Sequence, residues 1–133
     1  MTATRHVLSL AMAVLALAGC GRSGDRASVR TAAEGFYAAV ADHDGARACG
    51  WLSTAARDAL EKDESAPCAR AVERLELSGR RARRVELYVT NAAVALRGGD
   101  TVYLQDTARG WRIAAAGCRD PGYDRPADCE LES

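Results

Sequence analysis

RVELYVTNAAVALRGGDTVYLQDTARGWRI, residues 84–113, is the stretch that decides the fold, because short runs of alternating apolar and polar residues follow one another along it. Val85, Leu87 and Val89 alternate with more polar residues, and Val102 and Leu104 do the same over 101–105. Ala92, Val94 and Leu96, and likewise Trp111, Ile113 and Ala115, take every second position of two further runs. A period of two residues is typical of a half-buried strand. The stretch therefore predicts four strands.

Turn signals separate these four runs. Arg97-Gly98-Gly99-Asp100 is a strong hairpin signal, because two glycines can adopt the positive backbone angles that tight hairpin turns need. Thr90-Asn91 and the segment 107–110 are also suited to reversing the chain. The strands should therefore form an antiparallel meander.

The residues before the meander predict helices. Residues 28–42, SVRTAAEGFYAAVAD, begin with Ser28, a good N-cap, and carry an apolar stripe at helical spacing. Asp44, Ser53 or Thr54, and Pro67 suit the starts of three shorter helices. Helices followed by an antiparallel meander indicate an α+β fold.

The chain opens with a candidate export signal. Arg5 precedes the uncharged apolar run 7–18, which is the layout of a secretory signal peptide. The run is shorter than the roughly 20 residues that a membrane-spanning helix needs. Leu17-Ala18-Gly19-Cys20 resembles the lipobox of bacterial lipoproteins. The resemblance implies cleavage before Cys20 and attachment of lipid, including palmitate-type acyl chains, to its thiol; the alternative is an ordinary signal followed by a chance cysteine.

This signal predicts the location of the protein. We expect a chain held by lipid at the outer, extracytoplasmic side of the cell membrane. Residues 20–27, rich in glycine, serine and charge, should form a flexible tether of at most about 26 Å. The chain has 18 basic and 18 acidic residues, and this neutral balance gives no reason to expect nucleic acid as a partner.

The cysteines support export. Four remain beside Cys20, an even number that predicts two disulfides in an exported chain. Three pairings are possible, and short local loops favour Cys49–Cys68 and Cys118–Cys129. We expect no metal site, because no C-x-x-C occurs and the only histidine outside the signal is at position 43.

The order of motifs resembles the NTF2-like superfamily, as it occurs in small lipoproteins of high-G+C Gram-positive bacteria. The resemblance rests on the acidic-Gly loop 42–45, on CGWLST at 49–54, on the later Cys68 and on GWRI at 110–113. It implies a cone in which a curved antiparallel sheet wraps against helices around a pocket. The expected divisions are a signal peptide at 1–19, lipidated cysteine and tether at 20–27, an NTF2-like domain at 28–117 and a disulfide-closed tail at 118–133.

The strand faces favour binding over catalysis. The expected inward positions are all apolar, with no acid among them: 85, 87, 89, 94, 96, 102, 104, 111 and 113. Such a pocket suits a small apolar ligand rather than proton transfer, although side chains of the protein could equally fill the cone. The candidate pocket-lining residues are Phe36, Tyr37, Leu87, Val94, Leu104 and Trp111.

Three functions follow. The first is a non-catalytic module that binds a small apolar ligand or an envelope protein; no catalytic residue and no cofactor is predicted for it. The second, implied by enzymes of the superfamily, is an isomerase or dehydratase with an acid–base group among Asp42, His43, Asp44 and Tyr37. The third is a structural accessory of a membrane complex. A homodimer would use the outward sheet face, where Tyr88, Thr101 and Tyr103 are expected.

One basic cluster stands out, Arg80-Arg81-Ala82-Arg83-Arg84. It is interpreted either as a solvated entrance to the first strand or as a contact with anionic lipid headgroups.

Overall fold

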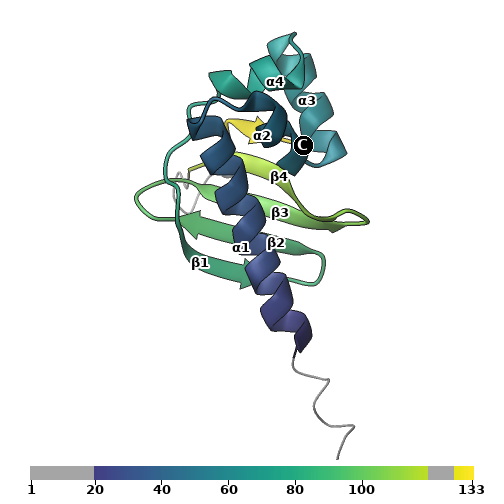
Figure 1. Cartoon of the computed structure of the whole chain (residues 1–133), viewed down its shortest axis with the longest axis vertical. Helices are drawn as coiled ribbons and strands as arrows, with labels where there is room; N and C mark the ends of the chain where they lie inside the picture. Colours follow the sequence, from purple (N-terminus) through teal and green to yellow (C-terminus); the bar gives the residue numbers. More distant parts are fainter. Residues whose placement is uncertain (1–19, 120–127) are drawn as a thin grey trace, which may run out of the picture.

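The computed structural model describes residues 20–119 and 128–133 and confirms the α+β class. Helices come first and a five-stranded antiparallel sheet follows (Figure 1). The elements are α1 (Cys20–Ala41), α2 (Gly45–Trp51), α3 (Thr54–Glu64), α4 (Cys68–Ala71), the 3-10 helix η1 (Val72–Arg74), β1 (Ala82–Leu87), β2 (Asn91–Leu96), β3 (Thr101–Thr107), β4 (Gly110–Cys118) and β5 (Leu131–Glu132).

The sheet has its strands in chain order, β1-β2-β3-β4-β5. The four predicted strands and their antiparallel pairing are confirmed. The predicted tail 118–133 ends in a strand for which the sequence analysis gave no signal, because Leu131 and Glu132 pair with Ala116 and Ala115 of β4. A strand of two residues is too short to display a period in the sequence.

The first helix begins earlier than predicted. It starts at Cys20 rather than after Ser28, so residues 20–27 are helical and not an irregular tether. Two side chains explain the difference: Arg26 donates to the carbonyl of Val85, and Asp25 accepts from the indole N–H of Trp111 at 3.5 Å. These contacts with distant residues oppose the low helix propensity of the glycine-rich segment.

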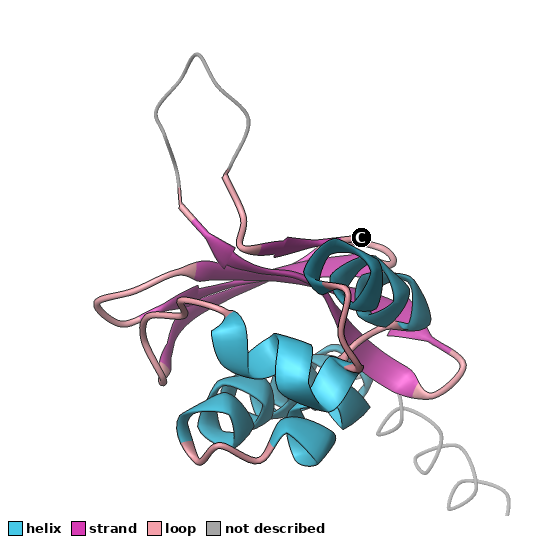
Figure 2. Ribbon diagram, turned by 90° about the horizontal axis from the view of Figure 1, so that it is seen from above, coloured by secondary structure: helices cyan, strands magenta, loops and turns pink. Residues whose placement is uncertain are grey.

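Helix α1 lies along the sheet, and the sheet curves around the helices (Figure 2). The Arg30 guanidinium donates to the carbonyl of Ala82 at 3.2 Å, and the Glu34 carboxylate accepts from the amide of Ala82 at 2.9 Å. Since these partners lie at the start of β1, they fix the direction of β1 against α1. The caps predicted at Asp44 and Ser53 are confirmed, because each side chain accepts from a backbone amide of its helix.

The core lies between the helices and the sheet. Its largest fully buried apolar side chains are Phe36, Leu104, Ile113, Val29, Val72, Val94 and Val102. The inward position predicted for Val89 is wrong: β1 ends at Leu87, and Val89 is 96% exposed in the turn that follows. An apolar residue in a turn continued the alternating pattern by chance.

Both favoured disulfides are confirmed. Cys49–Cys68 joins α2 to α4, and Cys118–Cys129 joins the end of β4 to the residues before β5. The predicted signal peptide and residues 120–127 of the predicted tail lie outside the described residues. Within the described ranges no helix is long and apolar enough to cross a membrane.

Candidate binding site

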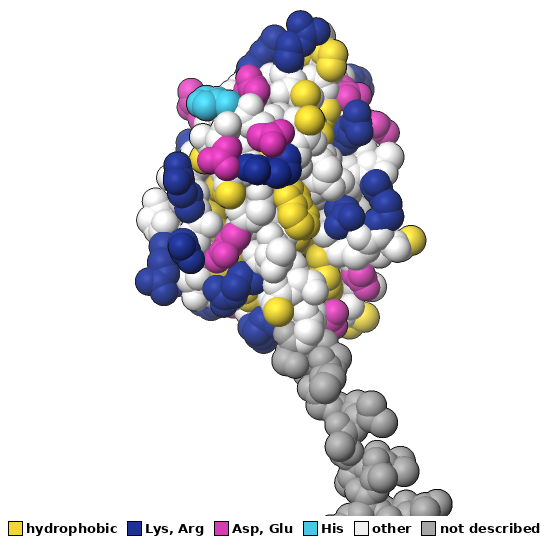
Figure 3. All heavy atoms as spheres, in the orientation of Figure 1, with side chains coloured by type: hydrophobic (Ala, Val, Ile, Leu, Met, Phe, Trp, Pro, Cys, Tyr) yellow, Lys and Arg dark blue, Asp and Glu magenta, His cyan; other side chains and the backbone are white. Residues whose placement is uncertain are grey.

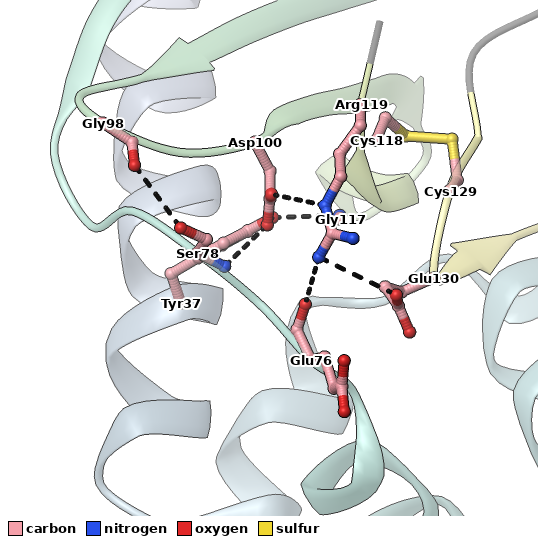
Figure 4. A network of polar contacts seen from close by, with 10 residues as sticks. All are labelled: Tyr37, Glu76, Ser78, Gly98, Asp100, Gly117, Cys118, Arg119, Cys129 and Glu130. Atoms are coloured by element: carbon pink, nitrogen blue, oxygen red, sulfur yellow. Dashed lines mark hydrogen bonds and ion pairs between the residues drawn. A yellow bond between two sulfur atoms is a disulfide. The ribbon is translucent and has the colours of Figure 1, made fainter. Parts of the chain in front are cut away.

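A buried carboxylate joins four parts of the fold (Figure 4). Asp100, only 3% exposed, follows the β2–β3 turn. Its Oδ2 atom accepts a hydrogen bond from the hydroxyl of Tyr37 at 3.1 Å and from the amide of Ser78 at 2.7 Å. The Tyr37 hydroxyl in turn accepts from the amide of Gly117 at 3.0 Å, and Arg119 lies 4.0 Å from the carboxylate. We call these five residues the Asp100 network.

The Asp100 network has a structural role, because its hydrogen bonds join separate parts of the fold. It links α1, the segment between η1 and β1, the β2–β3 turn and β4. Because both hydrogen bonds and the nearby guanidinium occupy the Asp100 carboxylate, it has partners for the charge it carries in the interior. The side chain is therefore suited to fixing the β2–β3 turn rather than to taking a proton from a substrate.

Titration of Tyr37 gives a prediction about alkaline stability. Burial raises the pKa of the Tyr37 hydroxyl; the Gly117 hydrogen bond opposes the shift and the charge of Asp100 adds to it. The unfolded chain ionises this tyrosine near the ordinary pKa of about 10, whereas the folded chain keeps it protonated. Its contribution to stability is therefore complete below about pH 10 and is lost as the pH rises above that value.

The measurement is urea unfolding between pH 8 and pH 11. We expect the unfolding free energy to fall less steeply with pH in Tyr37→Phe than in the wild type. Tyr103→Phe, a change at a partly exposed tyrosine of β3, is the matched control and should keep the wild-type slope. Parallel curves for the wild type and Tyr37→Phe would contradict the assignment.

A cavity of about 500 Å³ lies beside the Asp100 network. We call it the arginine cleft. The end of α1, the segment between η1 and β1, and the β2–β3 turn form it. Its lining residues are Tyr37, Val40, Ala41, Leu75, Leu77, Gly79, Arg80, Arg81, Arg97 and Gly98.

Close backbone contact shapes two walls of the cleft. The amide of Asp100 donates to the carbonyl of Ser78 at 2.9 Å, and the amide of Arg97 donates to that of Arg81 at 2.8 Å. A Cβ atom on Gly99 would lie 2.1 Å from the Ser78 carbonyl oxygen, so the approach requires glycine there. The Asp100 network and these bonds thus hold the two walls in place.

The predicted pocket-lining residues do not form one pocket. Phe36, Val94 and Leu104 are at most 1% exposed and belong to the core. Tyr37 lines the arginine cleft. Leu87 and Trp111 line a separate hollow of about 490 Å³ near the start of α1.

The two acids of the loop after α1 bind a neighbouring arginine at the surface. Asp42 forms an ion pair with Arg47 at 2.6 Å, and Asp44 caps α2 through the amide of the same arginine at 3.0 Å. His43 is exposed. The hydroxyl of Tyr37 binds Asp100 and Gly117 instead of these residues. The structure therefore does not bring the four candidates of the enzyme hypothesis together in one site: Asp42 and Asp44 both bind Arg47, whereas Tyr37 binds Asp100 and Gly117.

Two further surfaces bear on partners. On the outward sheet face, Tyr88 is 60% and Tyr103 is 39% exposed, and both line a hollow of about 390 Å³ with Thr101. The homodimer that would use this face stays a prediction. Over residues 20–119 and 128–133, no cluster of three or more potential metal ligands is found.

Sequence reasoning missed both Asp100 and the arginine cleft. The sequence analysis used Asp100 only as part of the turn signal Arg97-Gly98-Gly99-Asp100, which does not indicate that its carboxylate is buried. The only available hint was the proximity of Arg97 to a strong turn and of Arg80 to a strand start. Neither signal indicates that the segment before β1 and the β2–β3 turn lie side by side.

Comparison of the chain with protein-family models, with curated proteins and with solved structures finds no match. The fold and site therefore define the class only at the level of a two-disulfide α+β domain with a helix-lined sheet.

Proposed function

We propose that this protein is a lipid-anchored, extracytoplasmic binding module without catalytic activity. The observation that carries the binding role is the arginine cleft, an apolar-floored cavity with no acidic residue in its lining. General acid–base catalysis needs a titratable group directed at the ligand, and the buried carboxylate of Asp100 beside the cleft is held by Tyr37 and Ser78.

The N-terminal sequence supports the anchor. Leu17-Ala18-Gly19-Cys20 matches the lipobox pattern, and α1 begins at Cys20. An acylated Cys20 would thus continue directly into a helix of 22 residues, about 33 Å long at 1.5 Å per residue. The domain would lie close to the membrane without an irregular spacer. Two confirmed disulfides agree with an oxidising compartment.

We also propose that the fold is NTF2-like. The order of elements supports this, with an aromatic-bearing first helix, short helices, and an antiparallel sheet curved around them. In this chain, buried side chains such as Phe36 and Leu104 occupy the space between α1 and the sheet. Ligand binding is accordingly assigned to the arginine cleft, at the end of α1, and not to the interior of the cone.

The anchor is tested by Cys20→Ser in the full chain. We expect the wild type to fractionate with membranes and its N-terminal peptide to carry acyl chains on Cys20, because two or more chains give stable attachment. Cys20→Ser should lose the lipid and the membrane attachment. Ser28→Ala, a change at an exposed position of the same helix, should behave as the wild type. An unmodified Cys20 in the mature wild-type protein would contradict the proposal.

A further inference from the structure

The arginine cleft holds three positive charges without a carboxylate partner among the described residues. Arg80, Arg81 and Arg97 line it, and none of its ten lining residues is acidic. Other arginines of the described chain do lie within 4.0 Å of a carboxylate: Arg30, Arg47, Arg57, Arg74, Arg84 and Arg119. Arg26, Arg70, Arg83, Arg109 and Arg112 also lack such a partner in the described chain, so what distinguishes the cleft is that three unpaired arginines line one cavity.

The fold forces these charges together. The hydrogen bond from the amide of Arg97 to the carbonyl of Arg81 places the backbones of the two residues side by side, just after β2 and just before β1. Figure 3 shows basic side chains gathered at the left edge, over the start of β1 and the β2–β3 turn. Like charges that line one cavity repel one another, and a bound anion would relieve the repulsion.

The floor of the cleft is apolar. Val40, Leu75 and Leu77 are half-buried side chains that pack against the core and line the cavity. The volume of about 500 Å³ lies in the range of roughly 300–1,000 Å³ that is usual for small-molecule sites. Guanidinium groups donate paired hydrogen bonds to carboxylate or phosphate oxygens. A cationic rim over an apolar floor therefore suits a ligand with both features.

We propose that the arginine cleft binds an anionic amphiphile, a molecule with a carboxylate or phosphate head and an apolar tail. The inference rests on the proposed function as a binding module and names the ligand class. The cleft lies beside Ala41, at the opposite end of α1 from Cys20, about 30 Å along the helix. This position favours a single bound molecule over contact of the arginines with the membrane that holds the anchor.

The test uses the full processed protein in nanodiscs of neutral lipid, with empty nanodiscs as the blank. Calorimetry compares octyl phosphate, octanoate, octanol and inorganic phosphate. We expect octyl phosphate or octanoate to bind in a 1:1 ratio, and octanol to bind at least about tenfold more weakly because it lacks the charge. Inorganic phosphate should also bind more weakly, since it lacks the tail. Tighter binding of octyl phosphate would identify the natural ligand as a phosphate ester, and tighter binding of octanoate would identify it as a fatty acid.

Charge-removing variants connect the binding to the cleft. Arg81→Gln and Arg97→Gln should each weaken binding of the anionic probe by about tenfold. Arg109→Gln is the matched control, because Arg109 is exposed in the β3–β4 turn and has no carboxylate partner among the described residues. This variant should bind as the wild type does. Ala41→Phe adds bulk at the exposed end of α1 and should abolish binding of every probe.

Several results would overturn the proposal. If octanol binds as tightly as octyl phosphate, the site does not require a charged head. If inorganic phosphate binds as tightly as octyl phosphate, the site does not require an apolar tail. If Arg97→Gln binds the anionic probe as tightly as Arg109→Gln does, the arginine cleft is not the binding site. Native mass spectrometry of the same preparation separates this failure from that of the proposed function: a co-purified neutral ligand keeps the binding module and overturns the anionic class. No adduct and no probe binding overturn both.

Discussion

Asp100→Ala is expected to lower the free energy of unfolding by about 3 kcal/mol, because hydrogen bonds to a charged group contribute about 1.5–3 kcal/mol each. The substitution removes the acceptor for the hydroxyl of Tyr37 and the amide of Ser78. Since Asp100 is 3% exposed, water does not easily replace the lost carboxylate. Urea unfolding with both disulfides intact, followed by tryptophan fluorescence, measures the loss.

Two variants make this measurement specific. Asp106→Ala removes an exposed acid of the neighbouring β3 and should change stability by no more than about 0.5 kcal/mol. Asp100→Asn keeps one carbonyl acceptor and should have an intermediate effect. If Asp100→Ala and Asp106→Ala are equally stable, the Asp100 network does not hold the β2–β3 turn.

The loss would also reach the arginine cleft. Asp100 binds the amide of Ser78, and Ser78 directly precedes Gly79, Arg80 and Arg81, which form one wall. Without the carboxylate, only the backbone hydrogen bonds of Asp100 to Ser78 and of Arg97 to Arg81 would hold this wall, so Arg81 should be less firmly fixed beside Arg97. The same carboxylate thus stabilises the fold and positions the cationic rim, although it does not contact the proposed ligand.

The sheet could be predicted because its information is local. Each of the four long strands carries its own alternation, and Gly98-Gly99 marks a turn between two of them. The disulfides could also be predicted, since the favoured pairs Cys49–Cys68 and Cys118–Cys129 close short loops. Local pattern and loop length are properties that one sequence displays without its fold.

The features that escaped prediction depend on distant contacts. Residues 20–27 look like a tether, and only Val85 and Trp111, far along the chain, provide the partners that support a helix there. Asp100 looks like a solvated turn residue until Tyr37 is placed beside it. The arginine cleft combines three segments that the sequence separates, so its charge excess becomes visible only in the folded chain.

Gly45 gives the other large effect that we expect. It is the first residue of α2, at the contact with α4, and it is buried. A Cβ atom built at this position would lie 2.0 Å from the carbonyl oxygen of Ala69, a backbone atom that cannot turn aside. Helix propensity alone favours alanine over glycine by about 1 kcal/mol. The clash should dominate, because overpacking against a fixed neighbour costs about 1–3 kcal/mol or more.

Gly50 in the same helix provides the matched control. A Cβ atom there meets nothing within 4 Å, so Gly50→Ala should follow propensity and stabilise the protein by up to about 1 kcal/mol. Gly45→Ala should destabilise it by about 3 kcal/mol, since α4 must move and its position is fixed by the Cys49–Cys68 disulfide. Opposite signs for one substitution within one short helix can be read directly from urea unfolding curves. Two stabilising changes would mean that α2 and α4 are not packed as closely as their backbones indicate, whereas the expected pair would establish the contact by energetics alone.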